Sequence, residues 1–360
     1  MTKKNSPTLA ELAAAAGVST MSASRAVNLQ PGVSPQTRET ILKLAAEMGY
    51  VANRSAQKAS GGRSRMLGVL ARELDNAYTS ALVSGAVRAA AVAGHEVLIY
   101  SLADRTGIPD AGVLKLLQQF TEGLIAVLPY QNGFVQKLAS TGFPVITIDH
   151  HHEHNDWPSV TSDSYGGARA AMQHLAELGH RRIAFITGNE ELGSARARHQ
   201  AYDDAVAIHG LDKDPALVQR GDFSTRGGRD AMQRLLKLKH RPTAVFAAND
   251  RSAFGAISVL QGAGLRIPQD MSIVGFDDVP SASQLHPALT TVRQPISEMG
   301  RAAVNSLLGM VAGLEVATPR ITLPTELQIR QSTAAVARDH TVSRRGRSAG
   351  GPTGSRSRER

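Results

Sequence analysis

The first part of the chain carries apolar residues at helical spacing, divided by residues that begin or end helices. Thr8-Leu9-Ala10-Glu11 has the pattern of a capping box, in which the Thr8 hydroxyl and the Glu11 carboxylate each bind a free backbone amide. Gly17 predicts the end of this helix, because glycine readily adopts the left-handed conformation of a tight turn. Ser19 is then expected to cap a second helix over residues 20–27.

A third helix and a polar linker follow. Ser34-Pro35 places a capping hydroxyl before a proline at the first helical position, where no backbone hydrogen bond is lost. Apolar residues then recur on one face up to residue 48. Residues 50–65 are polar and include Gly61-Gly62, so they predict a linker, with one conditional helical turn near 53–59.

After Met66 short apolar runs alternate with amphipathic stretches. Strands are expected over 66–71, 96–100, 123–128, 144–148, 182–187, 243–248 and 271–276, and helices over 79–93, 164–178, 195–208, 225–238 and 252–263. Such alternation predicts an α/β body whose parallel sheet is covered by helices on both faces. About 270 residues exceed what one such sheet usually needs, so the body is expected to have two lobes.

Composition narrows the class of protein. The 360-residue chain is 42% hydrophobic and contains no cysteine, which excludes disulfides, thiolate metal sites and cysteine nucleophiles. No run approaches the roughly 20 apolar residues that a membrane helix needs. The lysines near Met1 precede no apolar segment, so no secretory signal is expected. A cytoplasmic protein without membrane contact is therefore predicted.

Positive charge is concentrated at the two ends of the chain. Of the net charge of +9, residues 1–65 contribute +6 and residues 338–360 contribute +5, so the middle of the chain carries −2. This distribution is typical of nucleic-acid-binding proteins, although basic tails also aid solubility. Residues 338–360 contain almost nothing apolar and are expected to be disordered. Their arginines either attract phosphates without sequence preference or form an inert extension.

The order of the first three predicted helices fits a helix-turn-helix. In that motif the N-terminal residues of the second helix enter the major groove of DNA. Thr20 and Met21 are expected at the exposed start of this helix, with Ser24 and Arg25 one turn later. Arginine suits a bidentate contact with guanine, and hydroxyl groups can donate to phosphates or bases. A capped three-helix unit can also be a plain packing module, so the pattern alone leaves both interpretations open.

The chain resembles the LacI/GalR (lactose-repressor) family of transcriptional regulators. The head resembles it through Thr8-Leu9, Ala13, Ala16-Gly17-Val18-Ser19 and Ser24-Arg25-Ala26-Val27-Asn28, and through Val33-Ser34, Thr37-Arg38, Gly49-Tyr50, Asn53-Arg54 and Ala56. The body resembles it through Leu67-Gly68-Val69, Ser162-Asp163, Gly179-His180-Arg181-Arg182-Ile183, Asn249-Asp250, Val274-Gly275-Phe276-Asp277-Asp278 and Leu289-Thr290-Thr291-Val292. The resemblance is collinear over about residues 7–332.

The resemblance implies a domain organisation and a set of DNA contacts. It implies a helix-turn-helix head over 7–52, a hinge helix and linker over 53–65, and a two-lobed, periplasmic-binding-protein-like domain for effector binding and dimerisation over 66–332, before the basic tail over 338–360. The implied DNA-binding residues are Thr8, Leu9, Ser19, Thr20, Met21, Ser24, Arg25, Asn28, Asn53, Ala56 and Ala59. In the family a hinge leucine wedges into the minor groove, whereas Ala59 has little bulk to unstack bases, so weaker bending is expected.

The resemblance also implies a small-molecule site where strands of both lobes end. Sugar capture needs carboxylates and amides for hydroxyl groups, an arginine as a fixed donor, and a flat apolar face. The expected effector-binding residues are Asp75, Asn76, Tyr78, Asp149, Arg198, Phe223, Asn249 and Asp277. An isolated Asp or Asn at a strand end often only caps the next helix. Of the neighbouring pair, Asp250 is therefore assigned to capping and Asn249 to the ligand.

Other chemistry has weaker support in the sequence. His150-His151-His152 with His154 resembles a metal-binding tract, but consecutive side chains cannot all face one ion, so no metal is expected. Residues 188–194 lack the Gly-Lys-Ser/Thr ending of a phosphate loop, and no nucleophile elbow is present. The alternatives to a regulator are a sugar-binding transport protein and a sugar-active enzyme on the same scaffold.

Together these patterns predict a nucleoid-associated repressor that is not an enzyme and needs no cofactor. As a homodimer it would bind a pseudo-palindromic operator, because the symmetry of the dimer is matched by that of its DNA site. A small effector, a sugar or sugar derivative, is expected to change its operator affinity. The sequence leaves open whether this effector releases or recruits DNA.

Overall fold

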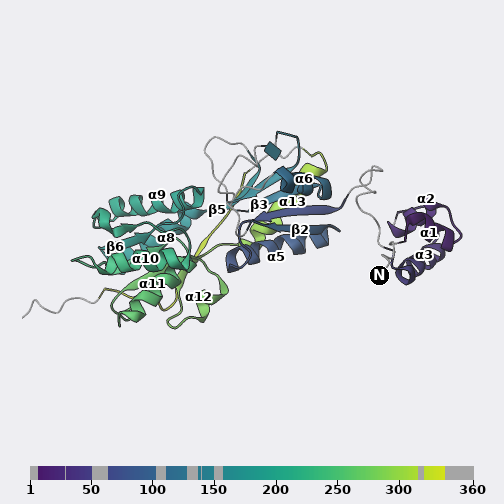
Figure 1. The fold of residues 1–360 in the computed structure, drawn as a ribbon. Coiled ribbons are helices and arrows are strands. Elements are labelled where there is room, and N and C mark those ends of the chain that lie inside the picture. The colour runs from purple at the N-terminus through teal and green to yellow at the C-terminus, as the bar shows by residue number, and fades with distance from the viewer. Residues whose placement is uncertain are drawn as a thin grey trace, which may run out of the picture. The chain divides into compact units, whose positions relative to one another are not determined.

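The computed structural model describes residues 7–28, 30–50, 64–102, 111–127, 137–138, 140–149, 157–314 and 320–336. The chain divides into two compact units, residues 1–66 with 111–122 and residues 67–110 with 123–360. The ribbon in Figure 1 shows three helices in the N-terminal part and two sheets with their covering helices in the body. The domain boundaries inferred from the sequence remain a prediction.

The three predicted helices of the head are confirmed. They are α1 (Leu9–Ala15), α2 (Thr20–Val27) and α3 (Pro35–Met48). The side chains of Thr8, Ser19 and Ser34 each accept the backbone amide three residues ahead, and the capping box of Thr8 with Glu11 is complete. Gly17 follows α1 with a φ of +65°, as its role in ending the helix requires.

A small apolar core holds α2 against the other two helices. Leu12, Ala26 and Ile41 are fully buried, one from each helix. The guanidinium of Arg38 on α3 donates to the backbone oxygen of Gln30 at 2.6 Å, which ties the α2–α3 connection to α3. These contacts leave the opposite face of α2 free, and Met21 is 63% exposed there.

The body contains two six-stranded sheets, one in each lobe. The first has the order β11-β5-β4-β3-β1-β2 and the second the order β12-β10-β9-β8-β6-β7. The strands are β1 (Met66–Ala71), β2 (Glu96–Ser101), β3 (Gly123–Val127), β4 (Val145–Ile148), β5 (Ser159–Ser162), β6 (Ile183–Ile186), β7 (Val218–Gln219), β8 (Ala244–Ala247), β9 (Ser272–Asp277), β10 (Thr290–Arg293), β11 (Arg320–Leu323) and β12 (Glu326–Gln328). The pairs β1–β3, β3–β4, β8–β9 and β9–β10 are parallel, while β10–β12 is antiparallel.

Several strands and helices of the body were not predicted from the sequence. The helices are α5 (Ala77–Val92), α6 (Ala111–Phe120), α8 (Ser164–Glu177), α9 (Gly193–Ile208), α10 (Thr225–Leu236), α11 (Asp250–Gly262), α12 (Pro280–Gln284) and α13 (Ile296–Val311), with a 3-10 turn at Pro215–Leu217. The sequence patterns did not predict β5, β7, β10, β11, β12, α6, α12 or α13. The missed strands have two to four residues and mix polar with apolar side chains, so their periodicity is weak. Neighbouring strands hold them in the sheets.

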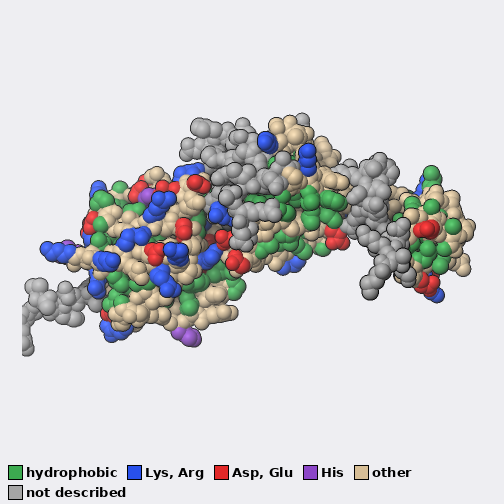
Figure 2. Space-filling model, viewed as in Figure 1, with side chains coloured by type: hydrophobic (Ala, Val, Ile, Leu, Met, Phe, Trp, Pro, Cys, Tyr) green, Lys and Arg blue, Asp and Glu red, His purple; other side chains and the backbone are tan. Residues whose placement is uncertain are grey.

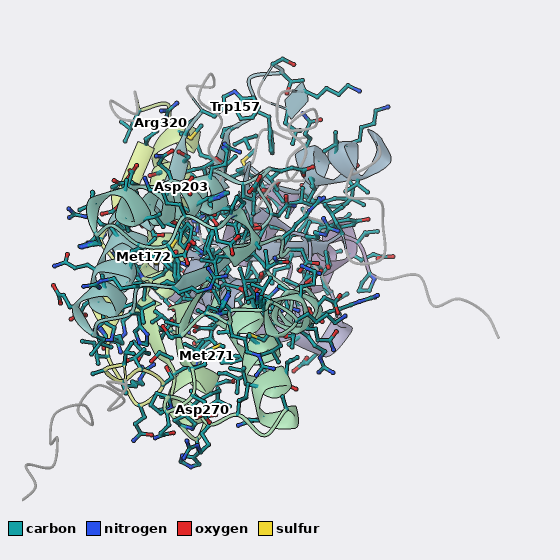
Figure 3. The ribbon with its side chains drawn as sticks, turned by 90° about the vertical axis from the view of Figure 1, so that its left-hand side faces the viewer. Trp157, Met172, Asp203, Asp270, Met271 and Arg320 are labelled. Carbon is teal, nitrogen blue, oxygen red and sulfur yellow. The ribbon has the colours of Figure 1, made fainter. Side chains whose placement is uncertain are left out.

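Helices cover both faces of the second sheet, as the sequence predicted. Strand residues alternate between the faces: Phe185 and Phe246 pack toward α8 and α9, whereas Val245 packs toward α10 and α11. Met172 and Met271, labelled in Figure 3, are buried in these two separate clusters. Because helices bury both faces of this sheet, its strands are continuous apolar runs in the sequence.

Two helices lie against one face of the first sheet and against each other. On α5 and α13 the closest approach is made at Gly85 and Gly300. A Cβ atom added to Gly300 would lie 2.2 Å from the backbone oxygen of Leu82, so no side chain fits there. No helix among the described residues is long and apolar enough to cross a membrane.

Candidate functional site

A cavity of about 250 Å³ lies among the strand ends of both lobes. Seven of the eight effector-binding residues expected from the sequence line it: Asn76, Tyr78, Asp149, Arg198, Phe223, Asn249 and Asp277. Asp75 is exposed and is not among the lining residues. The folded body therefore brings together side chains that are up to about 200 residues apart in the sequence.

Three of the lining residues have an unusual backbone conformation. The backbone φ angles of Asp149, Phe223 and Asp277 are 57°, 67° and 119°. Residues other than glycine rarely have positive φ angles. Asp277 is the last residue of β9, and Asp149 follows β4 directly. Backbone strain of this kind is commonly found at functional sites, where it fixes the direction of a side chain.

Arg198 is the central cation of the cavity. It is 2% exposed, and its terminal nitrogens donate to the Ala248 backbone oxygen at 2.6 Å and to the Ser164 hydroxyl at 3.3 Å. Its guanidinium carbon lies 3.6 Å from the ring centroid of Phe276, which supports the flat group from one side. Its Nε has no hydrogen-bond partner within the described part of the chain, which is uncommon for a buried donor.

Two buried carboxyl groups share the cavity with this arginine. Burial raises the pKa of Asp149 to about 6, against the opposing effects of Arg198 and of the Ser194 hydroxyl, which donates to it at 3.0 Å. Burial also raises the pKa of Asp277 to about 7, again against the effect of Arg198. The site thus combines the buried cation of Arg198 with two buried carboxyls that change protonation near neutral pH.

Gln294 links one of these carboxyls to the segments that join the lobes. Its Nε2 donates to Asp277 at 2.6 Å, and its Oε1 accepts from the Ser162 hydroxyl at 2.5 Å. Ser162 ends β5 in the first sheet, and Gln294 follows β10 in the second sheet. Asp277 is therefore connected by hydrogen bonds to the chain at the end of β5 and to the chain just after β10.

The structure gives Asn249 the capping role that was expected for Asp250. Asn249, expected to bind the ligand rather than to cap, is the N-cap of α11: it accepts the Ser252 amide at 2.9 Å and donates to the Phe223 backbone oxygen at 3.1 Å. Asp250, expected to cap, instead accepts the Val279 amide and the Thr291 hydroxyl in the buried interior. Asn249 still lines the cavity, but its oxygen and one amino hydrogen are already used.

Sequence reasoning missed ten residues of the cavity. They are Arg72, Glu73, Thr79, Val127, Asn189, Leu192, Asp222, Ser224, Arg251 and Gln294. Most of them follow a strand by only a few residues, the same signal that identified Asp149. Arg251 and Glu73 form an ion pair of 3.5 Å, and they come from elements on different sheets. Nothing local to either residue predicts that pairing.

We expect Asp277→Asn to make the protein more stable at pH 8. A raised folded-state pKa means that the ionised carboxyl is less favourable in the protein than in the unfolded chain, so its contribution to stability is lost as pH rises through about 7. The neutral amide avoids this loss and keeps an acceptor for Gln294. Thermal unfolding should show a gain of about 1–3 kcal/mol at pH 8 that vanishes near pH 4.

Asp270→Asn is the matched control for this measurement. Its ion pair with Arg266 lowers the pKa of Asp270 to about 2, so the same substitution removes a favourable charge. Asp270 lies on the surface of the second lobe, at the lower edge of Figure 3. If Asp277→Asn proves no more stable than the parent at pH 8, burial does not disfavour the Asp277 charge.

In the head, the predicted DNA-binding residues fall into two groups. Thr8, Ser19, Thr20, Met21 and Arg25 are exposed, while Leu9, Ser24 and Asn28 are half-buried, and the Asn28 amide donates to the Ser24 hydroxyl at 3.3 Å. Thr8 and Ser19 also cap α1 and α2. Asn53, Ala56 and Ala59 lie outside the described residues, as do His150, His151, His152, His154 and the tail over 338–360.

Comparison with known proteins decides the family. Residues 8–53 match the family model "Bacterial regulatory proteins, lacI family", and residues 172–333 match "Periplasmic binding protein-like domain". The chain is 32% identical over 337 residues to the transcriptional repressor CytR of Escherichia coli, which covers 93% of this chain and 98% of that protein. The chain belongs to the LacI family.

Solved structures of other LacI-family members share the whole fold. The Lac repressor dimer bound to operator and an anti-inducer superposes with a TM-score of 0.80 at 30% identity, over 92% of this chain and all of that chain. A complex of the regulator CelR with cellobiose superposes with a TM-score of 0.71 at 32% identity, over 91% of this chain. The predicted LacI-type head with a two-lobed α/β body is therefore confirmed.

Proposed function

We propose that this LacI-family regulator represses transcription as a homodimer and that a sugar in the cavity controls its affinity for a pseudo-palindromic operator. The observation that carries the proposal is that three buried charged side chains, those of Arg198, Asp149 and Asp277, line one cavity between the lobes. The carboxyls accept hydroxyl donors, and the free Nε hydrogen of Arg198 needs an acceptor. Relatives whose structures hold cellobiose or ribose support a sugar as the ligand.

The size of the cavity favours a small ligand. Its volume of about 250 Å³ is below the range of about 300–1,000 Å³ that is usual for drug-sized molecules. A single sugar ring fits this volume better than a long oligosaccharide. The half-buried ring of Phe223 supplies an apolar face beside the polar groups.

Ligand control follows from the position of the cavity between lobes. A ligand that contacts both sheets binds one lobe arrangement better than another, and it shifts operator affinity only by that difference, typically about 1–3 kcal/mol.

In our proposal the domains run over 7–52, 53–65 and 66–332, and the operator contacts are the eleven residues named above from the head and hinge. A cytoplasmic location and binding without turnover belong to the same proposal.

The proposal is tested with purified protein and an operator selected from a random-sequence library. Thermal-shift screening against a sugar panel should give hits, and each hit should change the operator affinity in a gel shift. Recovery of the sugar unchanged after incubation should distinguish the regulator from a sugar-active enzyme. A chain that selects no operator, or whose operator affinity responds to no bound sugar, would contradict the proposal.

We expect Arg25→Ala to weaken operator binding by about 10- to 100-fold. Arg25 is exposed on α2, and its guanidinium lies beside Gly32, where an added Cβ would be 3.1 Å from its Nη1. A bidentate arginine–guanine contact is worth about 1–3 kcal/mol of discrimination. Titration against the selected operator at fixed salt measures the loss, with the exposed Lys43→Ala on α3 as the control. If Arg25→Ala binds the operator as tightly as the parent, Arg25 does not contribute to operator recognition.

A further inference from the structure

The helix α10 carries a strongly basic outer face that neither the operator head nor the effector cavity explains. Residues 226–241 contain six Lys or Arg and one Asp, a net charge of +5 in a chain whose total is +9. Figure 2 shows Lys and Arg side chains gathering over the part of the body where Figure 1 labels α10. The outer face of α10 is defined here by Arg226, Arg229, Lys237 and Lys239, all of them exposed.

Hydrogen bonds and ion pairs account for only part of this charge. Arg234 and Arg241 have structural roles, because Arg234 donates to Gln219 and Arg241 to the Leu236 backbone oxygen. Arg229, Lys237 and Lys239, by contrast, have no hydrogen-bond or ion-pair partner in the described ranges. Arg226, with a side chain 91% exposed, has only a loose contact of 3.9 Å with Asp230.

The direction of the helix makes the arrangement more unusual. Positive charge is favourable at a helix C-terminus and unfavourable at the N-terminus, where the backbone amides are already positive. Arg226 and Arg229 lie in the first turns of α10, which begins at Thr225. Arg226, in the first turn, therefore opposes the helix dipole, so its charge does not serve to stabilise the helix.

The residue types on the outer face of α10 indicate which kind of ligand it would bind. Apolar side chains of α10, including Met232 and Leu235, are buried in the body, so the face offers charge without the aromatic or apolar core that protein interfaces usually have. Residues 224–241 contain no Phe, Tyr or Trp on which unpaired bases would stack. From Arg226 to Lys237 the helix rises about 16 Å, along which a duplex presents about one phosphate charge per 1.7 Å.

We propose that the outer face of α10 is a second DNA-binding surface, which contacts the phosphates of duplex DNA without sequence preference. A regulator bound to its operator through the head would thereby hold another DNA segment on its body. The proposal rests on the protein acting on DNA through its head.

The test is a capture experiment with the full chain. Protein is bound to a tethered operator duplex, and a fluorescent duplex of unrelated sequence is then added at about 50 mM salt. The parent protein should retain this second duplex, whereas Arg229→Gln with Lys237→Gln and Lys239→Gln should retain it about tenfold less well. The salt dependence of its affinity should fall in slope by about 2.7, which is about 0.9 for each lost phosphate contact.

Matched variants separate this surface from total charge and from the tail. Lys115→Gln with Arg169→Gln and Lys213→Gln also removes three exposed positive charges, at positions away from α10, and should capture DNA as the parent does. A chain that ends at residue 337 should still show capture that depends on α10. Operator affinity is measured for every variant and should not change, so that loss of head function is recognised separately.

Three outcomes would overturn the proposal. The first is equal capture by the parent and the α10 triple variant. The second is complete loss of capture in the chain that ends at residue 337, which would assign the activity to the tail. The third is displacement of the second duplex by polyglutamate at a lower charge concentration than by unlabelled duplex DNA, because that preference would indicate an acidic protein segment as the partner.

Discussion

Arg198→Ala should abolish effector control while leaving operator binding almost unchanged. The guanidinium is 2% exposed, stacked on Phe276 and bonded to the Ala248 backbone oxygen, so it is already fixed before any ligand arrives. Its removal also takes away the buried positive charge that lowers the pKa of both Asp149 and Asp277. Truncating one member of a buried, hydrogen-bonded charged group typically costs about 2–5 kcal/mol, so effector affinity should fall by at least about 30-fold.

The same experiment distinguishes shape from charge. Arg198→Lys keeps the positive charge but lacks the planar fork, so it should fail to restore tight binding. Arg182→Ala is the control: Arg182 pairs with Asp212 and Asp214 in the same lobe, outside the cavity, and its loss should lower stability without affecting effector affinity. Calorimetric titration with the sugar found by screening measures all three variants. Near-parental affinity in Arg198→Ala would show that Arg198 does not hold the ligand.

Gly300→Ala should destabilise the protein by about 1–3 kcal/mol. The added Cβ would lie 2.2 Å from the Leu82 backbone oxygen and 2.9 Å from the Ala86 amide nitrogen, both on the backbone of α5. Backbone atoms of a packed helix cannot rotate away as a side chain can, so α13 and α5 must separate. Their separation would open the buried cluster that includes Leu82, Met299 and Val304.

Gly309→Ala provides a control of opposite sign on the same helix. An added Cβ at Gly309 meets no atom within 4 Å, so only the helix propensity changes, and alanine is favoured by about 1 kcal/mol. Chemical denaturation of both variants at one pH gives the two free energies of unfolding. Equal effects at the two positions would mean that the α5–α13 approach does not limit side-chain size.

Much of the local structure could be predicted because its causes are local. The helix ends of the head are set by side chains three residues from the amides they bind, as with Ser19 and Ser22. The strand β1 was predicted over its whole length, because burial on both faces of a parallel sheet demands an unbroken apolar run. The short strand β10 escaped prediction, since only its neighbours β9 and β12 make it a strand.

The candidate site was predictable only in part. Strand-end positions identified Asp149 and Asp277, because parallel strands bring their carboxyl ends to one edge of a sheet. Which neighbour of a pair caps the next helix is decided in the folded chain: Asn249 caps α11 and contacts Phe223, whereas Asp250 binds Thr291 in the interior. Glu73 and Arg251 meet across 178 residues, so no local pattern predicts their ion pair.

The sequence by itself determined the family, the helix-turn-helix head, the alternation of strands and helices, and seven of the residues that line the cavity, including Arg198, Asp149 and Asp277. These properties depend on periodicity, capping and resemblance, all of which are properties of the linear chain. Only the tertiary structure decided the raised pKa values of Asp149 and Asp277, the link through Gln294, and the unpaired basic face of α10. Burial, charge pairing and exposure depend on which distant segments pack together, and that is fixed only when the chain has folded.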